Sequence, residues 1–137
     1  FKLKRAAYFH DIGKITLSDH ILKKKNLSEE EREEIRQHSI VGYRILSLFD
    51  DTIDLAEYVY NHHERWDGRG YPSGLKGEEI PLLSRIIYIV ESYERMINDK
   101  EIAEDKRKDY AIEAIKKGSG NKFDPKLVEE FIKMISK

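Results

Sequence analysis

Hydrophobic residues in this chain recur mainly three or four positions apart, which is the spacing of one face of an α-helix. The first such series comprises Leu3, Ala6 and Ala7, and His10 continues the same spacing. It predicts an opening helix that ends near the turn at residues 11–13. Residue 1 already lies within the periodic pattern and no capping residue precedes it. We therefore expect the chain to be part of a longer protein.

A capping-box pattern predicts the start of a second helix, because Ser28 is followed three residues later by Glu31. One face of this long predicted helix carries Ile35, His38, Gly42, Ile45 and Phe49. A shorter helix is expected over about residues 52–62. The segment 68–81 contains four glycines and two prolines, so we expect an irregular loop there.

The last third of the chain is also helical by its pattern. A strongly apolar series predicts a helix over residues 82–97, whose apolar face carries Leu83, Ile86, Ile87, Val90, Tyr93 and Met96. Another helix, over about residues 106–117, ends at Gly118, and a final one begins at Asp124–Pro125. Because strand patterns are nearly absent, the predicted fold class is all-α.

Composition limits the possible functions. The 137 residues, of which 39% are hydrophobic and 37% charged, fit one domain over residues 1–137. The 25 basic and 26 acidic residues are mixed along the chain, so binding to a nucleic acid polymer is not indicated. No apolar run is long enough for a membrane span and no leader opens the chain, so a cytoplasmic location is expected by default. Without cysteine, any metal must be held by imidazole and carboxylate groups.

Several polar residues fall on or beside the predicted apolar faces: His10, Asp11, His38, His62, His63, Glu91 and Glu94. A single histidine on such a face is usually a core side chain. A group of imidazoles and carboxylates from four segments is different, because buried carboxylates are unfavourable without a compensating cation. A metal site explains the group best, and the mixture of nitrogen and oxygen ligands favours iron, manganese or zinc.

The adjacent pairs His10–Asp11 and His62–His63 indicate more than one ion. Consecutive residues at a helix end can reach two neighbouring coordination positions, so a carboxylate can bridge two ions while the imidazole beside it binds one. In two-metal sites the ions hold the attacking and the leaving oxygen of a phosphoryl displacement. Hydrolysis of a phosphoester is the chemistry that fits this pattern.

Four motifs together resemble the HD-GYP domain, a branch of the HD metal-dependent phosphohydrolases. They are HDIGK at 10–14, HSIVG at 38–42, HHERWDGRGYPSGLKGEEIP at 62–81 and GSGNKFDP at 118–125. The resemblance runs through essentially the whole chain, and HHERWDGRGYP is very specific. It implies an HD-type helical bundle whose first helix would lie upstream of residue 1.

The resemblance also implies an activity, the hydrolysis of the bacterial second messenger cyclic di-GMP at a 3′–5′ phosphodiester to a linear dinucleotide and often GMP. It implies two, sometimes three, divalent ions, typically iron or manganese, with the ligands His10, Asp11, His38, His62, His63 and Glu91. Asp11 and Lys14 would be catalytic, and the Lys14 cation would stabilise charge on the substrate phosphate. Further substrate contacts would come from Arg69, Tyr71 and Lys100.

One region departs from the family pattern. Glu91 and Glu94 stand where the family usually has aspartates. In the family a basic and aromatic stretch follows, but in residues 98–102 of this chain Lys100 is the only cation. We expect Glu94 to orient a histidine. Two other functions stay open: a catalytically inactive receptor for metal and nucleotide, and an HD phosphohydrolase for another nucleotide. The resemblance further implies an upstream sensory or receiver domain, GGDEF-type partners and a homodimer of the full-length protein.

Overall fold

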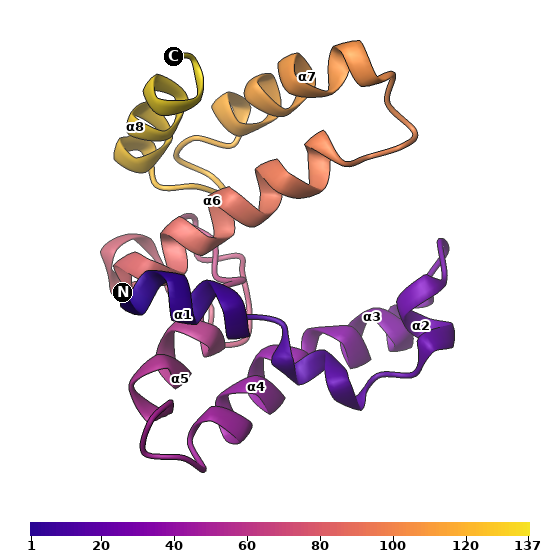
Figure 1. Ribbon diagram of the computed structural model, residues 1–137, viewed down its shortest axis with the longest axis vertical. Coiled ribbons are helices and arrows are strands. Elements are labelled where there is room, and N and C mark those ends of the chain that lie inside the picture. The colour runs from indigo at the N-terminus through magenta and orange to yellow at the C-terminus, as the bar shows by residue number, and fades with distance from the viewer.

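The computed structural model describes residues 1–137 and consists of helices without a β-sheet, which confirms the predicted all-α class (Figure 1). The α-helices are α1 (Lys2–Phe9), α2 (Asp19–Lys23), α3 (Glu29–Arg36), α4 (His38–Leu46), α5 (Ile53–Tyr60), α6 (Leu82–Ile97), α7 (Glu104–Lys117) and α8 (Pro125–Ile135). Two short 3₁₀ helices, η1 (Ile12–Thr16) and η2 (Gly77–Glu79), precede α2 and α6. None of these helices has the length and the apolar character that a membrane span requires.

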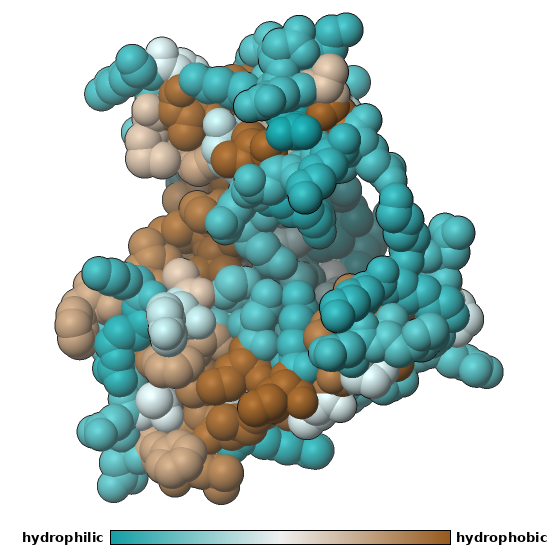
Figure 2. Space-filling model, turned by 45° about the vertical axis from the view of Figure 1, so that its right-hand side comes forward, coloured by the Kyte–Doolittle hydropathy of each residue, from teal (hydrophilic) through white to brown (hydrophobic).

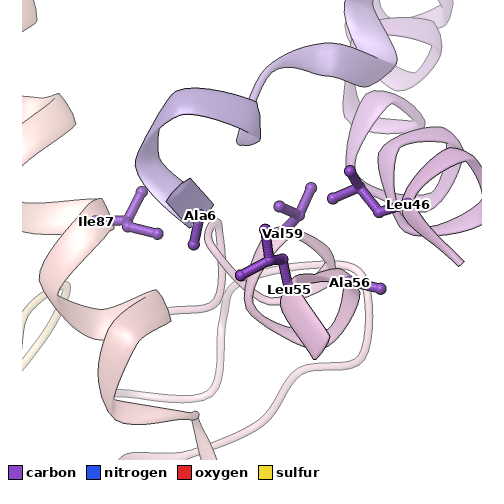
Figure 3. Close-up of a cluster of buried hydrophobic side chains, with 6 residues drawn as sticks. All are labelled: Ala6, Leu46, Leu55, Ala56, Val59 and Ile87. Atoms are coloured by element: carbon purple, nitrogen blue, oxygen red, sulfur yellow. The ribbon is translucent and has the colours of Figure 1, made fainter. Parts of the chain in front are cut away.

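Two groups of buried hydrophobic side chains form the core. The first group, drawn in Figure 3, joins α1, α4, α5 and α6 and comprises Ala6, Leu46, Leu55, Ala56, Val59 and Ile87. The second group joins α6 to the C-terminal part of the chain and comprises Ile89, Ile115, Phe123 and Val128. Because α6 contributes to both groups, it connects the two parts of the molecule that Figure 1 shows above and below it.

The buried side of α6 differs from the predicted one. The sequence pattern places Val90 on the buried face, but this residue is 44% exposed, whereas Ile89 is buried. The pattern assumes a single apolar stripe along the helix. Helix α6 instead packs on α1 and α5 with one side and on α7 and α8 with another, so Ile87 and Ile89 face different cores.

The long helix predicted after Ser28 is in fact two helices. The capping box of Ser28 and Glu31 is confirmed at the start of α3. At Gln37 the chain leaves regular α-helical geometry, and its N–H group is shared between carbonyl oxygens of the preceding turn. The second helix then begins at His38. Phe49 lies beyond the end of α4 and is 60% exposed, so its predicted place on a buried face is wrong.

The helix boundaries near the C-terminus follow the prediction. Helix α7 ends at Lys117, directly before Gly118. Asp124 caps α8, because its carboxylate accepts a hydrogen bond from the N–H group of Lys126. The same carboxylate forms an ion pair of 2.6 Å with Arg85 of α6. One aspartate therefore starts α8 and also ties it to the central helix.

Gly13 allows η1 to lie directly on α4. A Cβ atom at this position would lie 1.8 Å from the carbonyl oxygen of His38 and 2.7 Å from the backbone nitrogen of Gly42. Both are backbone atoms of α4, so they can make room only if the helix itself moves. The glycine of the HDIGK motif thus fixes how closely Asp11 approaches His38.

We expect Gly13→Ala to lower the free energy of unfolding by about 3 kcal/mol, because the added methyl group must push η1 away from α4. Urea unfolding followed by circular dichroism measures the change. Ile15→Ala in the same 3₁₀ helix is the control, since that side chain is exposed, and it should change stability by less than about 0.5 kcal/mol. Wild-type stability of Gly13→Ala would contradict the close approach.

Candidate metal centre

Folding brings the predicted ligands together from four separate segments. They are His10 and Asp11 after α1, His38 at the start of α4, His62 and His63 after α5, and Glu91 within α6. Their ligand atoms form two groups, and within each group the atoms lie within 4.8 Å of one another. The structure therefore unites all the side chains that the sequence analysis selected as ligands.

The first group consists of Asp11, His38, His62 and His63. The Nε2 atom of His38 lies 3.3 Å from that of His62 and 3.1 Å from that of His63. The Oδ1 atom of Asp11 lies 3.5 Å from Nε2 of His38 and 4.0 Å from Nε2 of His62. Three imidazole nitrogens and one carboxylate oxygen thus face one small volume, which is a donor set suited to a divalent transition metal.

The second group consists of His10, Asp11 and Glu91 and uses the other oxygen of the same aspartate. The Oδ2 atom of Asp11 lies 3.3 Å from Nε2 of His10, while Oδ1 faces the first group. Asp11 therefore belongs to both groups. This is the arrangement that the sequence analysis expected of a carboxylate next to a ligating histidine.

Backbone carbonyl groups orient three of the histidines. The Nδ1 atom of His10 lies 2.6 Å from a carbonyl oxygen, and those of His38 and His62 lie 2.5 Å from theirs. In each case the acceptor belongs to the residue three positions earlier: Ala7, Ile35 and Val59. Because a carbonyl oxygen only accepts, Nδ1 carries a proton in each of these rings, so the neutral form of each ring has its lone pair at Nε2.

Burial keeps most of these imidazoles neutral. It lowers the pKa of His38, and it lowers the pKa of His62 to about 3 and that of His63 to about 2. Neutral imidazole is the form that binds metal, so these side chains need not lose a proton at neutral pH. His10 differs, because its hydrogen bond with Asp11 raises its pKa to about 9.

Two carboxylate oxygens in the centre have no hydrogen-bond partner. They are Oδ1 of Asp11 and Oε2 of Glu91, and both atoms are buried. Burial and the nearby charge of Asp11 raise the pKa of Glu91, so its carboxylate is poorly compensated by the protein alone. A cation would satisfy both oxygens and would also relieve the repulsion between the converging Nε2 lone pairs. The residues therefore fit a divalent metal.

Lys14 of η1 lies beside the shared carboxylate. Its Nζ atom donates a hydrogen bond of 3.0 Å to Oδ2 of Asp11. Burial by itself raises the pKa of Asp11, but the hydrogen bonds and charges of His10 and Lys14 outweigh it and hold this pKa well below its usual range. Asp11 is thus ionised, which is the form of a carboxylate that binds metal, and Lys14 places a positive charge at the edge of the centre.

The loop that contains Gly70, Tyr71 and Pro72, here called the GYP loop, reaches the centre through its tyrosine. The Tyr71 ring stacks on the imidazole of His63, with centroids 4.9 Å apart and planes inclined by 20°. On the same ring, the guanidinium carbon of Arg36 lies 5.7 Å from the centroid. Tyr71 therefore lies next to the ligand groups, where the substrate contact predicted for it would be possible.

Glu64 has a structural role beside the ligands that the sequence analysis missed. Its side chain is buried, and its carboxylate accepts hydrogen bonds from the N–H groups of Ser73 at 2.6 Å, Gly74 at 3.1 Å and Leu75 at 3.0 Å. One carboxylate thus anchors the segment that directly follows the GYP loop. In the sequence, the only indication of this role is the position of Glu64 directly after His63. The motif does not show that residues 73–75 fold back onto the Glu64 carboxylate.

Three predicted residues form no hydrogen bond to the ligand side chains. The Glu94 side chain is exposed and forms no hydrogen bond to a histidine, so the orienting role expected of it falls to the backbone carbonyls. The Arg69 side chain is exposed and is hydrogen-bonded to none of the ligands. Lys100 is exposed beyond the end of α6 at Ile97, and this helix already extends about 9 Å past Glu91.

One face of the molecule has a hollow. Figure 2 shows a hollow between the part of the molecule that carries α6 and α7 and the part that carries α2 and α3, and hydrophilic residues frame it. Brown, hydrophobic residues gather instead toward the left and the lower part of this view. The hydrophilic character of the hollow suits a polar ligand better than an apolar one.

Residues 1–127 match the HD domain family, and the chain belongs to this family. The resemblance of its motifs to the HD-GYP branch is confirmed by curated relatives. A protein from Thermotoga maritima named cyclic di-GMP phosphodiesterase is 40% identical over 136 residues, which are 97% of this chain and 37% of that protein.

Two solved structures share the fold. An HDG"Y"P protein from Bdellovibrio bacteriovorus matches 99% of this chain and 44% of its own chain, with a TM-score of 0.74 and 18% identity. A cyclic GMP-AMP-specific phosphodiesterase from Vibrio cholerae matches 98% of this chain and 33% of its own, with a TM-score of 0.65 and 23% identity. These matches confirm the HD-type helical fold. The chain spans less than half the length of each of these relatives.

We expect Glu64→Gln to lower the free energy of unfolding by about 2 kcal/mol, because an amide group provides a donor where the loop offers only N–H donors. The emission of Trp66, the only tryptophan, should shift as the neighbouring loop loosens. Unfolding midpoints and fluorescence spectra measure both effects. Glu57→Gln, at an exposed position of α5, is the matched control and should change neither. A Glu64→Gln protein with wild-type stability and emission would disprove the anchoring role.

Proposed function

We propose that this chain is the catalytic domain of a metal-dependent phosphodiesterase that hydrolyses cyclic di-GMP. The reaction opens a 3′–5′ phosphodiester to a linear dinucleotide, and a second cleavage gives GMP. The observation that carries the proposal is the pair of ligand groups that share Asp11. The name of the Thermotoga maritima relative supports cyclic di-GMP as the substrate.

The proposed cofactor is a pair of divalent ions, iron or manganese. One ion would be held by His38, His62 and His63 and the other by His10 and Glu91, with Asp11 shared between them. When bound, such ions supply Lewis acidity and an activated water for attack on the phosphorus. A third ion, which the HD-GYP resemblance allows, stays a prediction.

The protein's own groups orient the ligands and compensate charge. The carbonyl groups that accept from Nδ1 hold the imidazoles in the tautomer that binds metal. Lys14 uses one of its three N–H groups on Asp11, and we assign the others to a phosphoryl oxygen of the substrate. There the ammonium stabilises the negative charge that develops during cleavage. Asp11 and Lys14 are thus the proposed catalytic residues.

The remaining proposed substrate contacts have unequal support. Tyr71 lies directly on the ligand His63. Arg69 and Tyr71 line the same cavity beside the centre. Lys100 rests on the family resemblance alone.

The proposed setting is second-messenger signalling in the bacterial cytoplasm. Residues 1–137 would form the HD-GYP domain, with the first helix of the family domain upstream of residue 1. A sensory or receiver domain in the rest of the protein, GGDEF-type partners and a homodimer of the full-length protein belong to the same proposal. Their support is the family resemblance.

Hydrolysis of cyclic di-GMP by the full-length protein, loaded with Fe(II) or Mn(II) without oxygen, should give linear product by chromatography. Asp11→Asn should reduce this turnover to background, because it removes the shared ligand charge while leaving the side-chain volume unchanged. Asp50→Asn, at an exposed position, is the matched control and should keep full activity.

Two outcomes of this assay would contradict the proposal. Tight binding of cyclic di-GMP with no metal-dependent turnover would make the protein a receptor. Selective turnover of a different nucleotide, in a panel of cyclic and linear compounds, would make it an HD phosphohydrolase of another specificity.

The two ligand groups predict different effects on metal content. Glu91→Gln should remove about one of two bound Mn(II) ions, because it weakens only the group that contains His10. Asp11→Asn should weaken both sites. Elemental analysis after dialysis at a fixed Mn(II) concentration measures the stoichiometry, with Glu94→Gln as control. Equal loss in Glu91→Gln and Asp11→Asn would argue against two separate groups.

A further inference from the structure

A polar cavity of about 400 Å³ lies beside the metal centre, and its lining includes Glu33, Arg36, Gln37, Arg69 and Tyr71. The Tyr71 side chain is common to both places, because it lines the cavity and also stacks on His63. A ligand in this cavity would therefore be separated from the metal ligands by a single aromatic side chain.

The polar side chains of the cavity are connected with one another. The carboxylate of Glu33 accepts hydrogen bonds from Gln37 at 3.0 Å and from Arg36 at 3.4 Å. The guanidinium of Arg36 also lies over the Tyr71 ring. These contacts hold Arg36 at the cavity and still leave several of its five N–H donors for a ligand.

This set of groups fits a purine base better than a free phosphate. Two arginines of the lining could bind a phosphate, but a phosphate has no use for the Glu33 carboxylate, whereas the N–H donors on the edge of guanine can bind to it. Guanine also presents O6 and N7 as a pair of acceptors, which arginine recognises with two parallel hydrogen bonds. Adenine carries an amino donor at the position of O6, so it would turn a donor toward the donors of Arg36. The planar guanidinium can in addition stack on a base.

We propose that this cavity receives one guanine base of the cyclic dinucleotide and that Arg36 is a specificity-determining residue for guanine. The inference rests on the proposed phosphodiesterase function and extends it to the choice of base. Arg36 ends α3 and His38 begins α4, so the base contact and a metal ligand are two residues apart. Placing the base would thereby also place the phosphodiester relative to the centre.

Arg36→Gln tests the assignment, because glutamine matches the N6 and N7 atoms of adenine instead of the two acceptors of guanine. In the full-length metal-loaded enzyme, KM for cyclic di-GMP should rise about 10- to 100-fold, and kcat should stay within about threefold of wild type. The inhibition constant of cyclic di-AMP as a competitor should not rise. Cyclic di-AMP is chosen because both of its bases are adenine, so its orientation in the site does not matter.

Two controls separate recognition from structural damage. Arg32→Gln changes the same residue type at an exposed position of the same helix, outside the cavity lining, and should leave both constants unchanged. Hydrolysis of bis(4-nitrophenyl) phosphate, a diester without a base, should be equal in wild type and Arg36→Gln. Equal rates on this compound show that the metal centre is intact.

An unchanged KM for cyclic di-GMP in Arg36→Gln would overturn the base assignment, and so would an equal weakening of both dinucleotides. Failure of the proposed function gives a different result. In that case the wild-type protein itself would cleave bis(4-nitrophenyl) phosphate but not cyclic di-GMP. The proposed guanine site would then be disproved together with the proposed function.

Discussion

Unprotonated imidazole nitrogens and a shared carboxylate face one another at the centre of this molecule, with separations between 3.1 and 4.0 Å. Such an arrangement is unfavourable without a cation, because lone pairs and buried carboxylate oxygens repel one another. The rest of the fold has to hold the ligands together against this repulsion. Helix α6 does so by packing in both hydrophobic cores, and Gly13 does so by letting η1 lie against α4.

Backbone groups supply much of the preorganisation around the centre. Carbonyl oxygens fix the tautomer of three histidines, and backbone N–H groups bind the buried carboxylate of Glu64. These contacts persist as long as the helices and the loop persist, so the ligands do not depend on mobile surface side chains for orientation. On the substrate side, Tyr71 joins the metal ligands to the polar cavity of Arg36. The Tyr71 side chain would thus border both the metal site and the base-binding cavity.

Short-range features of the chain were predictable. The all-α class, the capping box at Ser28 and the cap at Asp124 depend on residues that lie within one helical turn of each other. That the residues of the two ligand groups lie together was also predictable, because their motif is specific and because polar side chains on apolar faces need a compensating partner. Helix α2 escaped prediction, since its five residues are too few to show a period.

Features that depend on how distant segments approach one another could be seen in the three-dimensional structure alone. It divided the long predicted helix at Gln37, and it buried Ile89 in place of Val90, because α6 packs on two sides. It gave Asp11 a place in both ligand groups and brought Arg36 over Tyr71. Periodicity, caps and motifs are local, so the sequence was enough to predict most of the helices and the residues of the two ligand groups. Packing decided that Asp11 joins both ligand groups and that Arg36 lies over Tyr71, because contacts between distant segments leave no periodic trace in the chain.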